Sequence, residues 1–266
     1  MKNTLSRNNV TVFGEGKQTL IFGHGFGGDQ SMFKQLTPAF ENNFRIILFD
    51  HVGSGASDRN SFDEEKYQTL HGYAQDLLEI CETLEVENAV FIGHSVSAMI
   101  GVLASIQNPD YFERMVMIGP SPHYLNDAEY KGGFEETDIT DLLQMMEMNY
   151  VGWASHIAPI AMSNPDRPEL AENLEKSFRS NDPAITQKFL QATLLSDHRN
   201  DLADVTIPSL IIQCSDDSFV PAGVGEYLQQ NLKNSQLAVM DVKGHYPHIS
   251  HPDETIAIIK KYLSNS

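Results

Sequence analysis

Cysteine is nearly absent from this sequence. Its 266 residues include only Cys81 and Cys214, which are too few for the disulfide framework that stabilises small secreted proteins. We interpret both cysteines as buried packing residues rather than as a bridged pair. The first ten residues also show no basic segment followed by an apolar one, so we expect a protein of the reducing cytoplasm without a signal peptide.

Long apolar runs and basic residues are scarce as well. No apolar run approaches the ~20 residues that a membrane-spanning helix requires. The 18 lysines and arginines are outnumbered by 36 acidic residues, which gives a net charge of −18. Such a surface repels nucleic-acid phosphates and anionic lipids, so we expect neither a nucleic acid nor a membrane as a partner. Solubility explains the acidic excess more simply than a patch built for a basic partner does.

The sequence does contain a repeated alternation of short apolar segments and helical patterns. The apolar segments cover 10–13, 19–23, 45–50, 89–93, 115–119, 208–214 and 237–240. The helical patterns cover 31–40, 68–85, 222–232 and 253–263. This alternation predicts an α/β fold with a mostly parallel central sheet flanked by helices. Glycines between the first two apolar segments predict that these two form a hairpin.

The alternation stops between residues 123 and 200. Helical patterns at 139–151, 168–178 and 182–195 dominate there. The last one opens with Asp182 as an N-cap and Pro183 at the first helical position. We predict a helical cap at 123–200, inserted into a core domain made of residues 1–122 and 201–266.

Residues 89–101 organise the rest of the chain. An apolar segment ends at Gly93, Ser95 follows, and a helical stretch then begins. This order is typical of a nucleophile elbow, in which a serine is lifted off the sheet at a sharp turn between strand and helix. The motif is imperfect because Ser97 replaces its last glycine. An ordinary turn between a strand and a helix is the alternative interpretation.

Two further strand ends carry reactive side chains. Asp216 and Asp217 follow one predicted strand, and His245 follows the last one. Catalytic groups gather at the carboxyl edge of parallel sheets. With Ser95, one of the two acids and His245 give the order Ser, Asp, His that is typical of an α/β-hydrolase triad. Taken singly, each acid is more often a solvated turn residue and the histidine a surface residue.

These groups have complementary chemical roles. His245 can take the proton of Ser95, and a carboxylate can fix the imidazole tautomer. We expect the backbone amides of Phe26 and Val96 to form the oxyanion hole. The spacing of His245, His248 and His251 could also indicate a metal, but Pro247 interrupts it and no helical zinc motif is present. We therefore predict no metal site.

The motifs together resemble the RsbQ-like α/β-hydrolases, regulators of the bacterial general stress sigma factor, and the related strigolactone and karrikin receptors. The resemblance rests on residues 24–27, 50–55, 93–96, 213–217 and 244–245, and in the cap on 130–134 and 149–154. It implies an α/β-hydrolase fold, a small apolar pocket under a four-helix cap, and no cofactor. It also implies that a phosphatase with a sensory domain, like RsbP, is the partner.

The resemblance assigns the acid to Asp217, because the family's acid precedes a proline by four positions and Pro221 satisfies this. Asp216 is then a turn residue. The family usually has glycine where this chain has Ser97. We expect this side chain to crowd the helix against a neighbouring strand and to loosen the elbow.

Our leading hypothesis is a serine hydrolase that acts on a small hydrophobic ester, lactone or acyl compound and serves as a positive regulator of the stress response. A receptor that signals through its cap surface is the first alternative. Cofactor-free lyase or oxidative chemistry on the same fold is the second, disfavoured by the serine motif.

Six apolar cap residues are candidates to line the pocket, although such residues more often belong to the core: Phe134, Met145, Met146, Trp153, Phe189 and Leu194.

Overall fold

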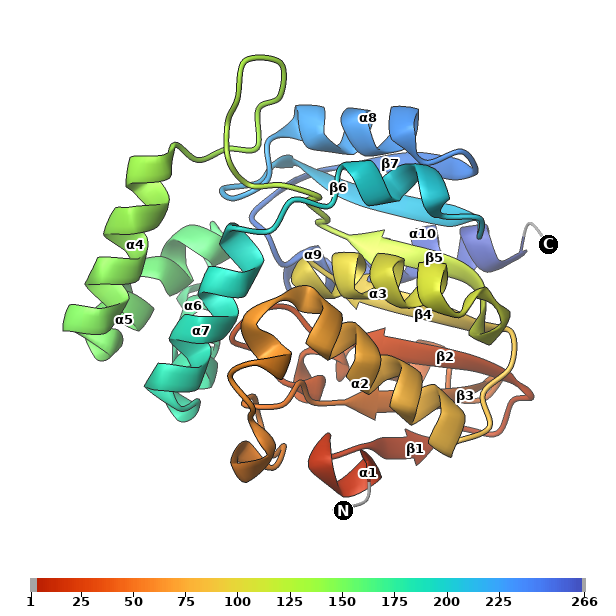
Figure 1. Ribbon diagram of the computed structural model, residues 1–266. Helices are drawn as coiled ribbons and strands as arrows, with labels where there is room; N and C mark the ends of the chain where they lie inside the picture. Colours follow the sequence, from red (N-terminus) through yellow and green to blue (C-terminus); the bar gives the residue numbers. More distant parts are fainter. Residues whose placement is uncertain (1–3, 265–266) are drawn as a thin grey trace.

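The computed structural model describes residues 4–264 and is built around a seven-stranded sheet (Figure 1). The strand order is β1-β3-β2-β4-β5-β6-β7. Only the pair β1 and β3 is antiparallel, and all other neighbours run parallel. The bounds are β1 Thr11–Phe13, β2 Gln18–Gly23, β3 Phe44–Phe49, β4 Ala89–His94, β5 Phe112–Ile118, β6 Ser209–Asp216 and β7 Ser235–Lys243. The predicted fold class is confirmed.

Helices cover both faces of this sheet, which explains why its strands are nearly continuous apolar runs. On one side lie α2 (Leu70–Thr83), α3 (Val96–Gln107) and α8 (Ala222–Asn231), and on the other α10 (Pro252–Ser264). Successive strand residues alternate between the two cores: Phe91 faces the first, whereas Val90 and Ile92 face the second. Two short α-helices, α1 (Thr4–Arg7) and α9 (Pro247–Ser250), also lie outside residues 123–200.

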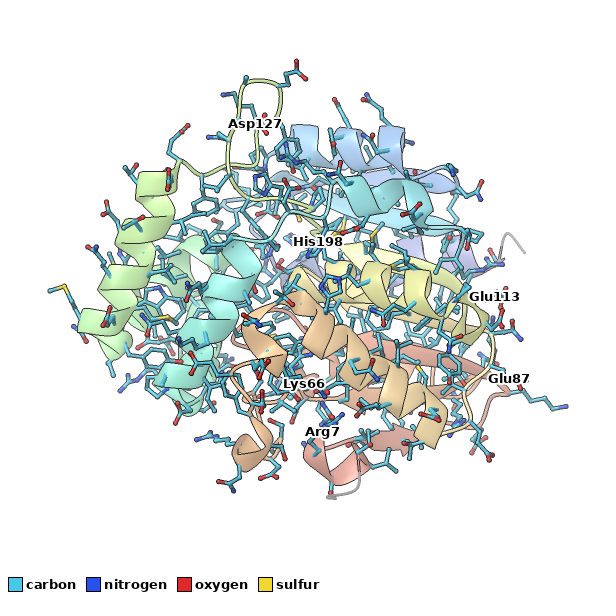
Figure 2. All side chains as sticks on the ribbon, viewed as in Figure 1. Arg7, Lys66, Glu87, Glu113, Asp127 and His198 are labelled. Carbon is cyan, nitrogen blue, oxygen red and sulfur yellow. The ribbon has the colours of Figure 1, made fainter. Side chains whose placement is uncertain are left out.

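A buried carboxylate fastens the N-terminal helix to the sheet's helical layer. Asp76 of α2 is fully buried and bonds Arg7 of α1 at 3.0 Å and Lys66 at 2.6 Å. Figure 2 shows both labelled cations in this lower part of the molecule. Two cations and the Tyr67 hydroxyl, 2.9 Å away, compensate the cost of burying the charge.

The predicted hairpin of the first two strands is wrong, because β3 lies between them. The glycines of the connection serve a different purpose. A Cβ atom on Gly14 would lie 2.2 Å from the carbonyl oxygen of Phe44, and one on Gly16 would lie 1.9 Å from that of Asn43. These glycines therefore let the chain pass directly against the start of β3, and they do not form a two-strand turn.

The helical stretch predicted at 31–40 is confirmed only in part, because it is not one continuous helix. The segment forms two short 3₁₀ helices, η1 (Gln30–Phe33) and η2 (Thr37–Ala39). Pro38 lacks the amide proton that the last turn of a continuous α-helix would need, and it lies instead in the first turn of η2.

Four α-helices lie between β5 and β6 in the chain and stand together at the left of Figure 1. They are α4 (Glu136–Met148), α5 (Tyr150–Met162), α6 (Pro168–Ser180) and α7 (Pro183–Leu194). Asp182 caps α7 as predicted, accepting hydrogen bonds from two backbone amides. The pattern at 139–151 merges two helices and misses most of α5, which contains Pro159 in its interior. The division into core and cap stays a prediction, and its outer ends lie outside the described residues.

Candidate active site

Ser95 occupies the turn between β4 and α3. Its backbone has φ 53° and ψ −120°, a conformation that residues with a side chain rarely adopt. Its amide donates to the carbonyl of Ile118 at 2.8 Å, which ties the turn to β5. A Cβ atom on Gly93 would lie 2.8 Å from the backbone nitrogen of Ala98, so this position has room only for glycine. The strand-turn-helix geometry inferred from the sequence is present.

The structure brings Ser95, His245 and Asp217 into one hydrogen-bonded chain. The Ser95 Oγ lies 2.7 Å from His245 Nε2, and His245 Nδ1 lies 2.8 Å from Asp217 Oδ2. The second carboxylate oxygen of Asp217 accepts from the amides of Phe219 and Val220 at 2.9 and 3.1 Å. The His245 side chain is 5% exposed and that of Asp217 is 0% exposed. His245 therefore has a partner at each ring nitrogen, and both carboxylate oxygens of Asp217 accept hydrogen bonds.

Asp216 takes no part in this arrangement. Its side chain is 65% exposed and pairs with Lys243 at 3.2 Å. The geometry thus distinguishes the two neighbouring acids in the way that the resemblance implies.

A close approach of the chain places His245. The preceding Gly244 has φ 91°, and a Cβ atom there would lie 2.2 Å from the carbonyl oxygen of Met162, at the end of α5. The His245 amide donates to the carbonyl of Ala161 at 2.8 Å. The loop that carries the histidine is therefore bound to the end of α5.

The two amides expected to form the oxyanion hole lie on separate segments. Val96 is the first residue of α3, where a backbone N–H has no acceptor within the helix and where the helix dipole favours negative charge. Phe26 lies in the loop after β2, and its amide donates to no acceptor among residues 4–264. The Phe26 ring packs against Trp153 and Phe189, with centroids 6.1 and 5.8 Å apart.

Ser95 and His245 open onto a small apolar cavity that is also lined by side chains of α4, α5, α6 and α7, with a volume of about 60 Å³. This space is sufficient for a few water molecules and is well below the ~300–1,000 Å³ of typical sites for drug-sized ligands. Its other walls are Phe26, Tyr124, Phe134, Leu142, Trp153, Ile157, Ala161, Phe178, Leu190, Thr193, Leu194, Phe219 and Tyr246.

Three of the six predicted pocket residues line this cavity: Phe134, Trp153 and Leu194. The other three do not. Met145 is 41% exposed on the outside of α4, and Met146 is buried in the core. Phe189 stacks on Tyr73 with ring centroids 4.3 Å apart. These errors reflect helix rotation, because each residue turns the side chain by about 100° and moves it to another face.

The other residues that line the cavity were not predicted from the sequence, although the sequence contains patterns that indicate some of them. On α5, Trp153, Ile157 and Ala161 follow one another at the four-residue spacing of a single helix face. Phe219 and Tyr246 each lie within two residues of a predicted catalytic side chain. Tyr124 has no such signal, and burial raises the pKa of its phenol to about 12.

Ser97 does not crowd the elbow, contrary to the expectation from the sequence. Its side chain is fully buried, and its hydroxyl donates to the carbonyl oxygen of His24 at 2.5 Å. Room for it exists because β2 ends in Gly23, where an added Cβ atom would lie 3.0 Å from the Ser97 side chain.

The histidines after His245 have structural surroundings. His248 is fully buried and stacks on Phe33, and burial lowers the pKa of its imidazole to about 3. His251 bonds the Ser250 hydroxyl at 2.9 Å. No group of three or more His, Cys, Asp or Glu side chains in the described chain is placed to hold a metal ion.

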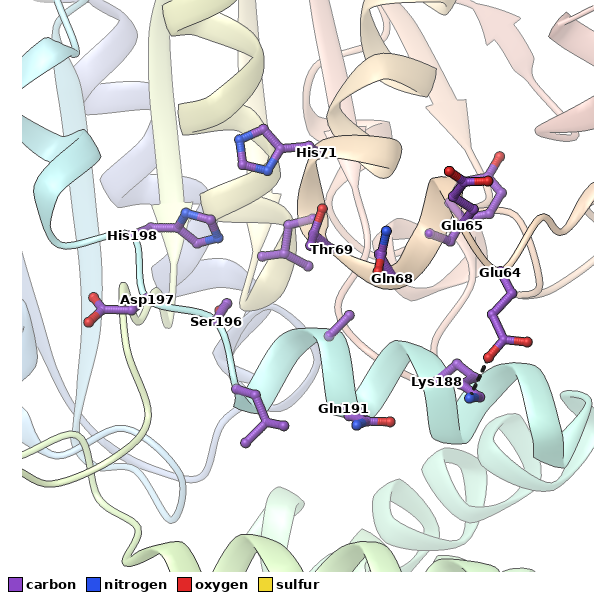
Figure 3. Close-up of a pocket in the computed structure, with 14 residues that line it drawn as sticks. Glu64, Glu65, Gln68, Thr69, His71, Lys188, Gln191, Ser196, Asp197 and His198 are labelled. Atoms are coloured by element: carbon purple, nitrogen blue, oxygen red, sulfur yellow. Dashed lines mark hydrogen bonds and ion pairs between the residues drawn. The ribbon is translucent and has the colours of Figure 1, made fainter.

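A larger open groove lies away from the triad, between α7 and residues 64–71 (Figure 3). It has a volume of about 800 Å³ and contains the ion pair of Lys188 and Glu64. None of the predicted site residues lines it. Among residues 4–264, no helix combines the length and the apolar character needed to cross a bilayer.

Comparisons with known proteins agree with this geometry. A family model described as the alpha/beta hydrolase fold matches residues 18–252. The karrikin insensitive 2 receptor CA of Petunia hybrida is 40% identical over 257 residues, covering 96% of this chain and 95% of that protein. The strigolactone esterase D14 of Arabidopsis thaliana is 37% identical over 262 residues, covering 98% of each. A solved hydrolase from Oleispira antarctica matches with a TM-score of 0.97 and 38% identity, covering 100% of this chain and 97% of that one. The chain therefore belongs to the α/β-hydrolase family.

Proposed function

We propose that this protein is a serine hydrolase that cleaves a small, mostly apolar ester, lactone or related acyl compound. The observation that carries the proposal is the continuous hydrogen-bonded chain from Ser95 through His245 to Asp217, which opens onto an apolar cavity. Relatives named as esterases support the same reaction class.

The reaction follows from the positions of these groups. His245 takes the proton of Ser95 as the serine oxygen attacks the substrate carbonyl, and Asp217 stabilises the resulting imidazolium. The amides of Phe26 and Val96 bind the oxyanion of the tetrahedral intermediate. His245 then protonates the leaving oxygen, and water, activated in the same way, releases the acyl group from Ser95.

The volume and the lining of the cavity limit the size and the charge of the substrate. With about 60 Å³ beneath the cap, only a short acyl group fits while the surrounding aromatic side chains stay in place. A larger lactone requires these side chains or the cap helices to move. The residues that line the cavity include no Asp, Glu, Lys or Arg, so an uncharged substrate is favoured.

The test compares the wild type with Ser95→Ala on p-nitrophenyl acetate. We expect kcat to fall by at least about 1,000-fold, because the nucleophile is lost and only binding and oxyanion stabilisation remain. Ser105→Ala is the matched control, since its hydroxyl bonds only within α3, to the carbonyl of Val102. Equal rates for wild type and Ser95→Ala would reject the proposal. Methanesulfonyl fluoride, a small serine reagent, should label the peptide that contains Ser95.

A second candidate function is signalling. In this function, slow hydrolysis changes the conformation of the cap surface, and a partner protein binds the changed surface. Two observations favour it: relatives named as receptors align over nearly the whole chain, and the cap exposes apolar side chains. Met148 is 86% exposed, and Met145, one helical turn away, is 41% exposed. The partner we propose is a phosphatase with a sensory domain, similar to RsbP, acting in a general stress response.

This candidate is tested in the organism that encodes the chain. A stress reporter is compared between a deletion strain and strains complemented with wild type, Ser95→Ala, or the double variant Met145→Ser/Met148→Ser. We expect the double variant to keep esterase activity and to lose the stress response. A deletion that leaves the response unchanged would reject the signalling function and would leave the hydrolase proposal intact.

A further inference from the structure

Ser97, His24 and His51 form a buried hydrogen-bonded cluster directly beneath the elbow. All three side chains are 0% exposed. The Ser97 Oγ lies 2.5 Å from the carbonyl oxygen of His24 and 2.7 Å from His51 Nε2. The same His51 nitrogen lies 3.2 Å from the His24 carbonyl oxygen. One carbonyl oxygen thus has two side-chain donors beside it.

The proton positions in this cluster follow from its acceptors. His51 Nε2 faces the His24 carbonyl oxygen, which can only accept, so Nε2 carries the proton. The Ser97 hydroxyl then accepts from His51 and donates its own proton to the His24 carbonyl. His24 Nε2 accepts from the His51 amide at 3.1 Å, so His24 Nδ1 is the nitrogen that donates, to the Gly25 carbonyl at 2.8 Å. Burial holds the pKa of His51 well below its usual value, which keeps the ring neutral.

The cluster joins the two segments that carry the oxyanion amides. Ser97 follows Val96 in the first turn of α3, two residues after Ser95. His24 precedes Phe26 by two residues in the loop after β2. The hydrogen bond between them is therefore a direct link from the helix that carries one amide to the loop that carries the other.

We propose that Ser97 is a positioning residue, whose hydroxyl fixes the separation of the Phe26 and Val96 amides by holding the His24–Phe26 loop against α3. This inference rests on the proposed hydrolase function. Two other side chains, Ser177 and Asn181, donate to the carbonyl of Gly27 at 3.0 Å each, but they tie the loop to α6 and its end, whereas the Ser97 hydroxyl ties it to α3. A misplacement of about 1 Å in a catalytic group can cost about 100-fold in rate.

Ser97→Ala is the decisive variant, because it removes the hydroxyl and keeps the Cβ atom that packs beside Gly23. We expect kcat on p-nitrophenyl acetate to fall about 10-fold, less than the roughly 100–1,000-fold expected for deleting an oxyanion donor outright. KM should stay within about twofold, since the substrate's ground state makes little use of the oxyanion hole. Ser105→Ala, on the same helix, should leave both constants unchanged.

A second measurement separates positioning from plain stabilisation. Ethylboronic acid forms a tetrahedral adduct with an activated serine and places an oxygen in the oxyanion hole. Its affinity for Ser97→Ala should drop by about the same factor as kcat. Ser97→Gly removes the side chain altogether and should show the same losses of kcat and of boronate affinity. Agreement between the two variants would exclude an effect specific to alanine.

The outcomes are distinguishable. A lower unfolding midpoint with unchanged kcat and boronate affinity would mean that the hydrogen bond only stabilises the fold, and would overturn the inference. Turnover that Ser95→Ala abolishes and Ser97→Ala leaves unchanged would reject the positioning role alone. Turnover that survives in Ser95→Ala would reject the proposed function, and the inference with it.

Discussion

The two neighbouring acids, Asp216 and Asp217, have opposite environments. Asp217 has no exposed side-chain surface and accepts from two backbone amides as well as from His245. We expect Asp217→Asn to lower kcat by about 10⁴-fold, because an amide NH₂ facing His245 Nδ1 would stabilise the wrong imidazole tautomer. Steady-state kinetics on p-nitrophenyl acetate measures this loss.

Asp216→Asn is the matched control for this prediction. Within residues 4–264, the exposed side chain of Asp216 makes only an ion pair with the exposed Lys243, an interaction of little energetic weight. Its replacement should leave kcat unchanged. A large loss in Asp216→Asn, or none in Asp217→Asn, would contradict the assignment of the acid.

At the level of elements, the elbow depends on the close packing of β4 against α3. An added Cβ atom on Gly93 would meet the backbone nitrogen of Ala98 and the carbonyl carbon of Ser97, each at 2.8 Å. Backbone atoms cannot move aside as side chains do. Gly93→Ala should therefore lower the free energy of unfolding by about 1–3 kcal/mol, measured by urea denaturation, and should lower kcat as well.

Gly223→Ala is the control for Gly93→Ala, at a glycine where an added Cβ atom meets no neighbouring atom. Gly223 lies in α8, and nothing stands within 4 Å of the position where its Cβ atom would be. Alanine is the better helix former, so this variant should raise the free energy of unfolding by up to about 1 kcal/mol. Equal destabilisation of both variants would show that the elbow makes no special demand for glycine.

Elements were predictable from the sequence where local pattern decides them. The apolar runs of β3 and β4 and the stripe on α2 identified these elements within a few residues. The position of β1 was not predictable, because strand pairing is decided by contacts distant in sequence. The division of 136–162 into α4 and α5 depends on Asn149, whose side chain caps α5 by accepting from the amide of Gly152.

Across the whole molecule, the candidate site was predictable to the extent that it lies at strand ends. Ser95, Asp217 and His245 each follow a strand, and the parallel sheet brings such ends to one edge. The cavity walls were less predictable because they depend on the rotation of cap helices. The Ser97 cluster was missed altogether, since it requires knowing that Gly23 and His51 lie beside the elbow.

The protein as a whole buries several histidines, and this predicts a loss of stability in mild acid. Burial holds the pKa values of His51 and His94 well below the usual range and lowers that of His248 to about 3. Each ring stays neutral in the folded protein but takes up a proton in the unfolded chain below about pH 6.5. The stabilisation is therefore complete above pH 6.5 and declines as the pH falls.

Urea denaturation at pH 7.5 and 5.5 measures this effect. Each buried histidine should contribute about 1.4 kcal/mol to the loss over this interval, or about 4 kcal/mol for the three. Carboxylates with lowered pKa values, such as Glu79, lose their contribution only below about pH 4.5 and leave this window unaffected.

His248→Phe isolates one of these three contributions. Both ring nitrogens of His248 are buried without a hydrogen-bond partner within the described residues, and the ring stacks on Phe33 with centroids 5.3 Å apart. Phenylalanine can keep this stacking and cannot take up a proton in the unfolded chain. The stability difference between the two pH values should therefore shrink by about 1.4 kcal/mol. His71→Phe, at an exposed position, should leave the difference unchanged, and an unchanged difference in His248→Phe would contradict the assignment of a buried neutral ring.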